Sequence, residues 1–393
     1  MTDSNRSAFS KALIGLYVVS FASGFSMGIF NPLISILMEQ AGVDQILIGA
    51  NSSLYYLIIG LASPLVAGFI RSYKLKVTIF LGILLTTFST AVFPFTHDIV
   101  HWFILRAIMA IGVCLYMVAG QTGLNIYADD EKRGLIVALH GSAFGVGFMI
   151  SPILGTYLYS LFPIYAFAYS SVVIFAAIFA VLFLLPKNVV NYQCNYSSNI
   201  FRKISIPLHG AMIYGMLEGI LVTLLPILMV RQAISVSLVG LPLTLFMVSS
   251  GIGMIPVCFF SDKFGRSNVL YVAAFVAVAT LIITSLSSHP LVYVIASVAL
   301  GLSVGTFFPL TLAMVGERLP HGEMHTGSSM FTGVFSMGCA LGPLTSAALI
   351  SYLGERHMFS LVIVALLILV IRMTPKQITS DQPELKQQEG VNS

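Results

Sequence analysis

The sequence predicts an all-α membrane protein whose twelve transmembrane helices form two pseudo-symmetric six-helix bundles. Three observations lead to this fold class. The composition is far too apolar for a soluble chain, apolar runs of helical length recur along it, and motifs of the first half return in the second. Of the 393 residues, 57% are hydrophobic and only 9% are charged, whereas soluble domains carry about 25% charged residues.

Apolar runs of roughly 20 residues follow one another along nearly the whole chain, each long enough to cross a hydrocarbon core of about 30 Å. Only a helix satisfies its own backbone polar groups in such a core, apart from closed barrels. The twelve expected spans are 12–38, 45–70, 75–96, 99–127, 134–161, 164–186, 207–230, 237–260, 267–287, 290–316, 325–352 and 356–373.

The only long polar interior segment, 187–206, separates the first six spans from the last six. It predicts a cytoplasmic central loop between an N-terminal bundle over 12–186 and a C-terminal bundle over 207–373. The polar segment 1–11 is expected to be cytoplasmic and, because a full-length span follows it directly, not to be a removable signal peptide. The polar tail 374–393 is expected to be disordered and cytoplasmic.

The distribution of cations predicts the orientation. When the N-terminus is placed in the cytoplasm, all but three of the 19 Lys and Arg residues fall on the inner side. Arg231 and Arg356 fall outside, and Arg106 lies within a span. Since cytoplasmic loops carry the excess of Lys and Arg, we expect a multi-pass protein of the inner (plasma) membrane with both termini in the cytoplasm.

Two motifs of the first half recur in the second half, at a spacing of nearly half the chain length. "GFIRSYKLK" from Gly68 and "CFFSDKFGR" from Cys258 both close the second helix of a half. "GFMISPILGT" from Gly147 and "GCALGPLTSA" from Gly338 both lie in the fifth helix of a half. Such spacing indicates an internal duplication, a common design in transporters that bind their substrate between the two halves.

Six plus six spans, with D-K-x-G-R after the eighth, resemble the major facilitator superfamily over about residues 10–375. Within that family the chain is most similar to bacterial drug-efflux-like and sugar-efflux-like members. The resemblance implies a secondary transporter that works by alternating access. It also implies a substrate site between the halves, lined by the first, fourth, seventh and tenth helices.

The family's loop motif reads G-x-x-x-D-K/R-x-G-R/K, and its second half is present after the eighth span. A glycine permits the tight turn, an acid can face the dipole or cations of a neighbouring helix, and basic residues hold the loop at anionic headgroups. The resemblance implies that these contacts latch one state of the transport cycle, beyond fixing the topology. The residues expected to form this latch are Asp262, Lys263, Gly265 and Arg266.

The first copy of the loop motif is eroded. Counted from Gly68, which is also assigned to the latch, the acid position holds Ser72 and the second glycine position holds Leu75. Only the positive charge of the motif is kept. This departure leaves open which half supplies the latch.

The fifth helix of each half resembles the motif G-x-x-x-G-P-x-x-G-G, which the family associates with antiporters. Small residues every four positions let another helix approach closely, and proline bends a helix that must rock. The resemblance implies export of the substrate. The residues expected to act as helix hinges are Gly147, Pro152 and Gly155 in the first half, and Gly338, Gly342 and Pro343 in the second.

Apart from histidines, only Arg106 and Glu218 are ionisable groups deep within spans. A charge in the membrane costs several kcal/mol unless it faces a partner or water. Arg106 and Gly112 resemble the family's fourth-helix motif R-x-x-x-G-x-G, with Ala110 where the first glycine usually stands, and this resemblance implies proton coupling or substrate orientation. Glu218, removed from water, is expected to load and release a proton near neutral pH. The alternative is that both groups are paired within the protein and never titrate.

Further polar groups in the spans could join this site. Tyr214 lies one turn before Glu218 on the same face, and Gln121 lies loosely on the face of Arg106. Asn31 is expected to be proton-coupling or substrate-binding with them. Other side chains that could line the cavity, or equally form helix–helix hydrogen bonds or pack, are Asn51, Tyr55, Asn125 and His140.

Other classes of function find little support. The four cysteines show neither metal spacing nor a disulfide pattern, and neither a phosphate-binding motif nor an HExxH or GxSxG motif occurs. The basic residues form no patch for nucleic acid. We therefore expect no enzyme activity, no cofactor and no metal site.

The sequence thus predicts proton-coupled antiport, in which a functional monomer in the lipid bilayer exports a small organic solute in exchange for protons. One alternative is proton-coupled uptake of an anionic metabolite or siderophore, since Arg106 could hold a carboxylate. An alternative from another class is a membrane receptor or assembly factor that keeps the fold and transports nothing.

Overall fold

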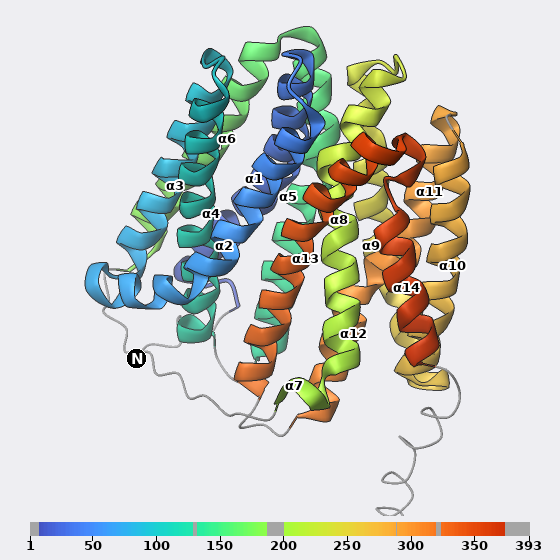
Figure 1. Ribbon diagram of the computed structural model, residues 1–393. Helices are drawn as coiled ribbons and strands as arrows, with labels where there is room; N and C mark the ends of the chain where they lie inside the picture. The colour runs from blue at the N-terminus through green and yellow to red at the C-terminus, as the bar shows by residue number, and fades with distance from the viewer. Residues whose placement is uncertain (1–7, 129–131, 187–199, 288, 320–323, 374–393) are drawn as a thin grey trace, which may run out of the picture.

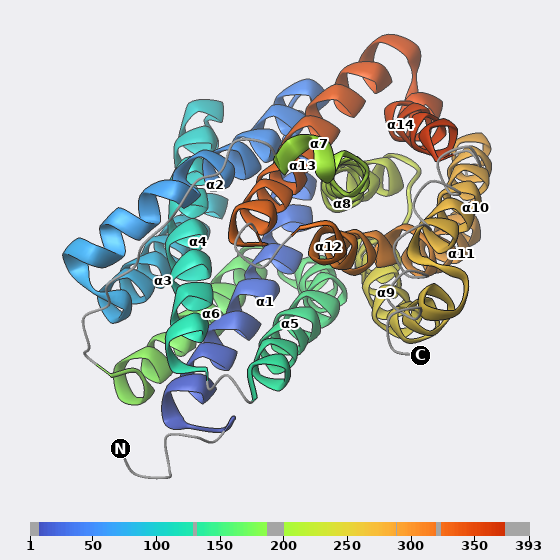
Figure 2. The same cartoon turned by 90° about the horizontal axis from the view of Figure 1, so that it is seen from below.

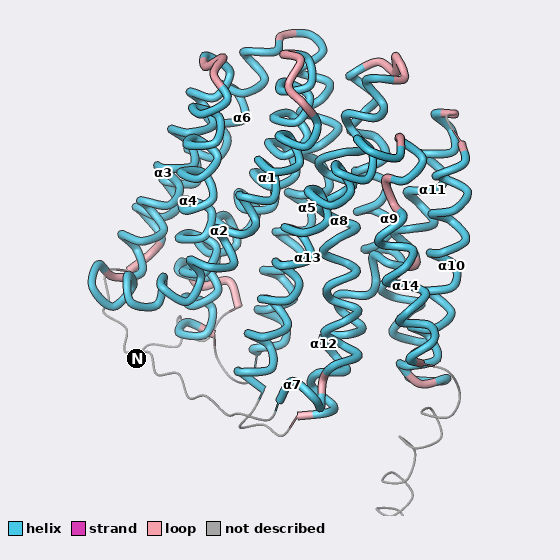
Figure 3. Tube along the Cα trace, viewed as in Figure 1, coloured by secondary structure: helices cyan, strands magenta, loops and turns pink. Residues whose placement is uncertain are grey.

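The computed structural model describes residues 8–128, 132–186, 200–287, 289–319 and 324–373 (Figure 1). Over these ranges the chain is helical and contains no strand, as predicted (Figure 3). The expected cytoplasmic segment before residue 8, most of the expected central loop and the tail expected to be disordered lie outside the described residues.

The first half of the chain contains six long helices, and a side-chain oxygen caps three of them. Ser10, Asp44 and Asp98 accept hydrogen bonds from backbone N–H groups of the first turns, which would otherwise lack partners. The helices are α1 (Lys11–Gln40), α2 (Gln45–Tyr73), α3 (Leu75–Val92), α4 (Ile99–Tyr127), α5 (Arg133–Leu161) and α6 (Pro163–Leu184), with a 3₁₀ turn η2 (Phe93–Phe95) after α3.

The second half repeats this order after a short helix, α7 (Ile200–Lys203), within the expected central loop. Its tenth span is divided: the helix ends at Ser303 and restarts after a 3₁₀ turn, with Pro309 in the new first turn, where a missing N–H is harmless. The helices are α8 (Ser205–Arg231), α9 (Val236–Phe264), α10 (Arg266–Leu286), α11 (Pro290–Leu302), α12 (Phe307–Arg318), α13 (Met324–Leu353) and α14 (Ser360–Arg372), with 3₁₀ turns η4 (Val304–Thr306) and η6 (Glu355–His357).

Eleven segments among the described residues are long and apolar enough to cross a membrane, with Pro290–Arg318 counted as one. The remaining expected span, 356–373, corresponds to the end of η6 and the 13-residue helix α14. The helices form two groups, α1–α6 and α8–α14, which are seen along the bundle in Figure 2. The twelve-span architecture with two six-helix halves is therefore confirmed.

The halves are built alike at a spacing of 191 residues. In the first half α5 packs on α1, and in the second α13 packs on α8. A Cβ at Gly147 would clash with the carbonyl oxygen of Phe21, and a Cβ at Gly338 would clash with that of Met212. Both members of the second pair lie 191 positions after their counterparts, so the same helix–helix contact occurs in each half.

Two equivalent contacts join the halves, one where α2 meets α13 and one where α5 meets α9. A Cβ at Gly49 would lie 2.8 Å from the carbonyl oxygen of Pro343, and a Cβ at Gly240 would clash with that of Pro152. Hydrogen bonds lie beside each contact, from Ser53 Oγ to the Ala340 oxygen (2.5 Å) and from Thr244 Oγ1 to the Met149 oxygen (2.9 Å). We call these two glycine–proline contacts the pivots.

Among the described residues, the close contacts between the halves lie toward one end of the bundle. We call the end at which α1 begins and α14 ends the terminus side, and the opposite end the far side (Figure 1). Both pivots lie in the far-side halves of their helices. Closer to the terminus side, Cβ atoms at Gly145, Gly251 and Gly333 would meet nothing within 4 Å. The halves therefore pack together on the far side and separate toward the terminus side.

We predict that Gly240→Ala destabilises the packed arrangement by about 1–3 kcal/mol, because its Cβ would clash with backbone that cannot move aside. Gly251→Ala on the same helix is the matched control. It should be neutral or stabilising by up to about 1 kcal/mol, since alanine is the better helix former. Thermal unfolding of the two variants in detergent compares them, and equal melting temperatures would contradict the close approach at this pivot.

Candidate functional site

The buried guanidinium of Arg106 is the centre of a polar cluster formed by α1, α2 and α4. Arg106 is only 1% exposed. Its Nη2 donates to Asn31 Oδ1 at 2.5 Å and its Nη1 approaches Met109 Sδ at 3.6 Å. Its guanidinium carbon lies 4.3 Å from the centroid of the Tyr55 ring, within the range of a cation–π interaction. Two sequence-predicted residues, Arg106 and Asn31, are thus in direct contact.

Asn31 links the arginine to a second tyrosine. While its Oδ1 accepts from Arg106, its Nδ2 donates to the Met27 carbonyl at 2.8 Å and lies 3.3 Å from Tyr56 Oη. The Tyr55 and Tyr56 rings meet edge to face at 5.1 Å. An amide suits this place because it offers an acceptor and a donor at once. We name Asn31, Tyr55, Tyr56 and Arg106 the arginine cluster.

The positive charge of Arg106 has no carboxylate partner among the described residues, whose ion pairs involve other groups. Its Nε and the Oη of Tyr55 are buried and have no hydrogen-bond partner among the described residues. A tyrosine face and one amide oxygen compensate only part of the cost of burying a cation. Part of the cost of burying the positive charge of Arg106 is thus left uncompensated by the described residues.

Glu218 lies on α8, in the other half, and is 6% exposed. Tyr214 lies one turn earlier, close enough for the two side chains to interact, and its ring packs against Phe308 and Phe335 with centroids 5.9 and 5.7 Å away. Glu218 forms no ion pair with any described residue. The carboxyl group is thus buried at the middle of a helix whose residues are almost all buried.

Tyr56 of the arginine cluster and Glu218 lie on helices that touch across the halves, because Ser52 of α2 and Thr223 of α8 share a hydrogen bond of 2.6 Å. The arginine cluster and the Glu218–Tyr214 pair therefore face the same interface from opposite halves.

Other polar residues of the spans lie apart from this interface. Gln121 is exposed, 15 residues after Arg106 on α4, or about 22 Å along the helix. Asn51 is buried and approaches the Trp102 carbonyl within its own half at 3.4 Å. His140 is half-buried, and its carbonyl accepts from Ser20. The side chain of Asn125 is outside the described part of the structure.

Sequence reasoning missed Tyr56 and a set of contacts on the far side. Arg231 donates to both carboxylate oxygens of Glu39, from Nε at 2.7 Å and from Nη2 at 2.9 Å. Its Nη1 donates to Gln45 Oε1, and Gln45 Nε2 donates to the Ala347 carbonyl at 2.9 Å. We name Glu39, Gln45 and Arg231 the far-side clamp. The far-side clamp ties α1 and α2 to α8 and α13. Its only signal in the sequence is that Arg231 is a cation expected on the outer side, where few cations fall.

The expected hinge residues fall at close helix contacts. Gly147 and Gly155 pack α5 on α1, and Gly338 and Gly342 pack α13 on α8. The carbonyl oxygens of the two prolines lie at the pivots between the halves, and the ring of Pro343 also faces Gly219 of α8 within its own half. The expected hinge glycines thus make contacts within each half, whereas the prolines contribute to the contacts between the halves.

The expected latch lies where α9 turns into α10. Gly265 has φ 84° there, a conformation that glycine adopts without strain. Arg266 pairs with Glu317 of α12 at 3.2 Å, within the same half. Lys263 is exposed with its Nζ 5.3 Å from the Phe264 ring centroid, and the side chain of Asp262 is not described.

The equivalent turn of the first half is made by Lys74, with φ 69°. Lys74 lies 191 positions before Gly265, so it, rather than Leu75, occupies the second glycine position of the eroded motif. Gly68 lies six residues before its turn residue whereas Cys258 lies seven before Gly265, so the two are not equivalent. An alignment of the two segments by residue type pairs Gly68 with Cys258, because the sequence alone does not show which residue of each segment makes the turn.

A model of the Major Facilitator Superfamily matches residues 16–194 and 208–392. The chain belongs to the Major Facilitator Superfamily. It is similar to the MFS-type transporter YfkF of Bacillus subtilis (strain 168), with 28% identity over 333 residues that cover 82% of this chain and 84% of YfkF. It is also similar to the MFS-type transporter YcaD of Salmonella typhimurium, with 24% identity over 377 residues, 89% of this chain and 91% of YcaD.

Solved structures of this superfamily share the fold. The nucleoside transporter NupG superposes with a TM-score of 0.74 at 14% identity, covering 92% of this chain and 98% of NupG. A bacterial homologue of the human lysosomal transporter Spinster, in an inward-facing and unoccupied conformation, superposes with a TM-score of 0.75 at 14% identity, covering 95% and 97%. This superfamily member is therefore a multi-pass membrane protein with the architecture of small-molecule transporters.

Proposed function

We propose that this protein is a proton-coupled antiporter that exports a small organic solute by alternating access. The observation that carries the proposal is Glu218, a carboxyl group buried at the interface between the halves without a cation among the described residues. A carboxylate in such a place costs several kcal/mol, and a protonated carboxyl avoids most of that cost. Opening of the interface to water on either side would therefore let Glu218 exchange a proton with that side.

The alternation would be a rocking motion of the segments 12–186 and 207–373 about the two pivots, with 187–206 as the segment that connects them. We propose that the terminus side faces the cytoplasm, as the distribution of Lys and Arg favours. The described arrangement would then be open to the cytoplasm and closed outside by the far-side clamp. A single copy would carry out the cycle in the inner membrane.

The latch would act in the opposite state. Arg266 pairs with Glu317 inside its own half while the terminus side is open. We propose that closure of this side brings the loop of Asp262, Lys263, Gly265 and Arg266 against the other half, where its charges would hold the closed state.

Uptake of an anionic metabolite is the second candidate, favoured by the arginine cluster. Arg106 is a buried cation without a carboxylate among the described residues, and an anionic solute group would supply the missing charge. In that case protons and solute would move in the same direction. Asn31 and Tyr56 would position the solute relative to Glu218.

Proton flux in proteoliposomes that contain the purified protein distinguishes these functions. Each member of a solute library is added outside, and the internal pH is followed with an enclosed dye. For antiport we expect at least one solute to drive protons out as it enters, because transport runs in both directions. Entry of protons with the solute would instead establish the uptake mode. If no solute of a broad library moves protons, the proposed proton coupling is wrong.

A further inference from the structure

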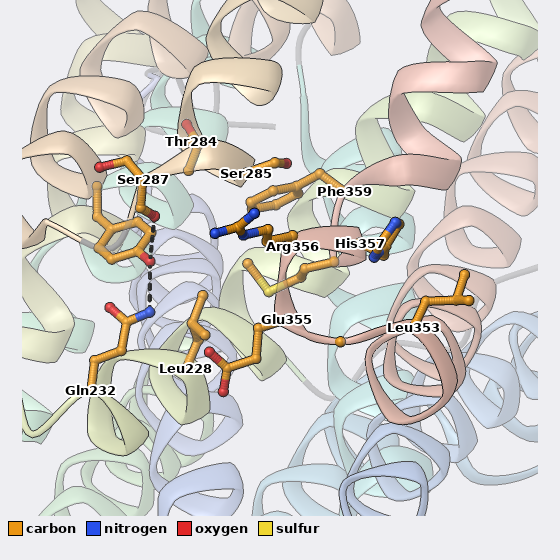
Figure 4. A pocket seen from close by; sticks show the side chains of 13 residues that line it. Leu228, Gln232, Thr284, Ser285, Ser287, Leu353, Glu355, Arg356, His357 and Phe359 are labelled. Carbon is orange, nitrogen blue, oxygen red and sulfur yellow. Dashed lines mark hydrogen bonds between the residues drawn. The ribbon is translucent and has the colours of Figure 1, made fainter.

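A pocket of about 360 Å³ opens at the far side of the second half, separate from the arginine cluster (Figure 4). It lies between the end of α8, the end of α10, the start of α11 and the turn η6 that connects α13 to α14. Its volume is that of a site for a small organic molecule. Nothing in the proposed transport cycle uses it.

The equivalent place in the first half is filled by aromatic side chains. Phe93 stacks on Trp102 at 6.1 Å and on Phe167 at 6.2 Å, with the rings within 6° of parallel. At a spacing of 191 residues, the counterparts of Phe93, Trp102 and Phe167 are Thr284, Tyr293 and Met358. All three line the pocket. The pocket exists because every ring of the stack is replaced by a smaller side chain.

A conserved internal contact fixes this register. In the first half Trp102 Nε1 donates to the carbonyl of Thr96 at 3.0 Å. In the second half Tyr293 Oη donates to the carbonyl of Ser287 at 3.2 Å. Thr96 and Ser287 are also 191 positions apart. The two halves therefore superpose here residue by residue, and the difference between them is one of side chains.

The substitutions also make the pocket polar. Gln232, Ser285 and His357 line it, whereas Ala41, Pro94 and Ala166 stand 191 positions earlier. Gln232 Nε2 donates to Tyr293 Oη at 2.9 Å. The Oε1 of Gln232, the Oγ of Ser285 and the Nδ1 of His357 are buried and find no hydrogen-bond partner in the part of the chain that the structure describes. Buried polar groups of this kind are costly unless something hydrogen-bonds to them.

The pocket carries one cation that the described residues leave unpaired. Arg356 forms no ion pair among them, and in Figure 4 its side chain points toward Ser287. Glu355 also lines the pocket, so its carboxylate is a second charged group of the lining, opposite in sign to Arg356. Leu228 and Phe359 supply apolar wall. The lining thus combines the guanidinium of Arg356, the carboxylate of Glu355, a hydroxyl and a ring nitrogen that can donate hydrogen bonds, an amide oxygen that accepts, and apolar surface.

From these features we infer that the pocket binds a small carboxylate with an apolar body. The guanidinium of Arg356 would face the carboxylate, and the space left by the missing aromatic stack would hold the apolar part. This site is distinct from the transport site and does not depend on proton coupling. A bound carboxylate would lie next to Gln232, the residue that follows Arg231 of the far-side clamp.

Benzoate is a suitable probe, with benzamide and benzylamine as neutral and cationic analogues of the same size. Binding to the full-length protein in nanodiscs would be measured by calorimetry. Benzoate is expected to bind, and both analogues at least about tenfold more weakly, because neither carries the negative charge that strengthens a hydrogen bond from the guanidinium of Arg356.

Two variants locate the site. Thr284→Phe returns the residue that the first half has at this place and is expected to fill the pocket, and Arg356→Gln removes the exposed cation. Each should weaken benzoate binding at least about tenfold. The matched control is Ile283→Phe, which adds the same ring at the neighbouring position, 60% exposed and outside the pocket. It should bind benzoate like the wild type.

Three results would overturn the inference: no benzoate binding to the wild type, stronger binding of benzylamine than of benzoate, or benzoate binding that survives both Thr284→Phe and Arg356→Gln. Because Arg356 is exposed, Arg356→Gln should leave the fold intact. It therefore tests the role of the charge even if Thr284→Phe disturbs folding. The Glu218→Gln variant should keep benzoate binding, so a failure of the transport proposal would be seen separately from a failure of this one.

Discussion

Glu218→Gln is expected to abolish transport against a gradient while leaving downhill exchange of solute intact. The amide keeps the size and hydrogen-bonding capacity of the side chain but cannot release a proton, so the pH gradient no longer drives the cycle. A pH difference of one unit corresponds to about 1.4 kcal/mol and supports up to a tenfold solute gradient per coupled proton. We expect the wild type to build such a gradient and the variant to build none.

The measurement uses everted vesicles and the solute found by the proton-flux screen. Solute accumulation under an imposed pH gradient is compared with exchange of labelled solute without one. Asp98→Asn, which neutralises an exposed helix cap that asparagine can also form, is the matched acid-to-amide control and should accumulate solute normally. Tyr214→Phe should preserve the ring packing and most of the transport. Accumulation by Glu218→Gln at the level of the wild type would refute the assignment of the proton site.

Arg231→Ala is expected to shift the protein toward conformations that are open on the far side. The substitution removes both hydrogen bonds to Glu39 and the one to Gln45, which are the charged contacts that tie the halves together there. The Arg231 and Glu39 side chains are 33% and 15% exposed, so water screens part of the attraction. A loss of about 1–2 kcal/mol would change the ratio of the two states by roughly 5- to 30-fold.

Spin labels at Ala41 and Tyr352, in a background without the native cysteines, would report this change as a population of longer distances. Glu39→Gln should have a similar effect, and the double variant should add little to either single change, because both remove the same pair. Asp44→Asn removes a nearby exposed charge while keeping a capping side chain, so it should leave the distances unchanged. Unaltered distances in Arg231→Ala would show that the far-side clamp does not hold this end closed.

Much of the architecture could be read from the sequence because it depends on local composition. A helix must satisfy its own backbone in lipid, so the length of each apolar run predicts a span. The match to the family model confirms the superfamily, and the helices of the structure confirm the two six-helix halves. The same reasoning identified Arg106 and Glu218 as the ionisable groups of the interior, since charges are rare there. Their roles in transport remain predictions.

The partners of those groups were decided only by the tertiary structure. Helical periodicity shows which residues share one face of a helix, but not which helix that face meets. Asn31 and Arg106 are 75 positions apart, and Glu39 and Arg231 are 192 apart. Such pairs form through the tilt and packing of whole helices, which no local pattern encodes. For the same reason the duplication was visible in the sequence, whereas the pocket left by its missing aromatic stack appeared only when both halves were folded.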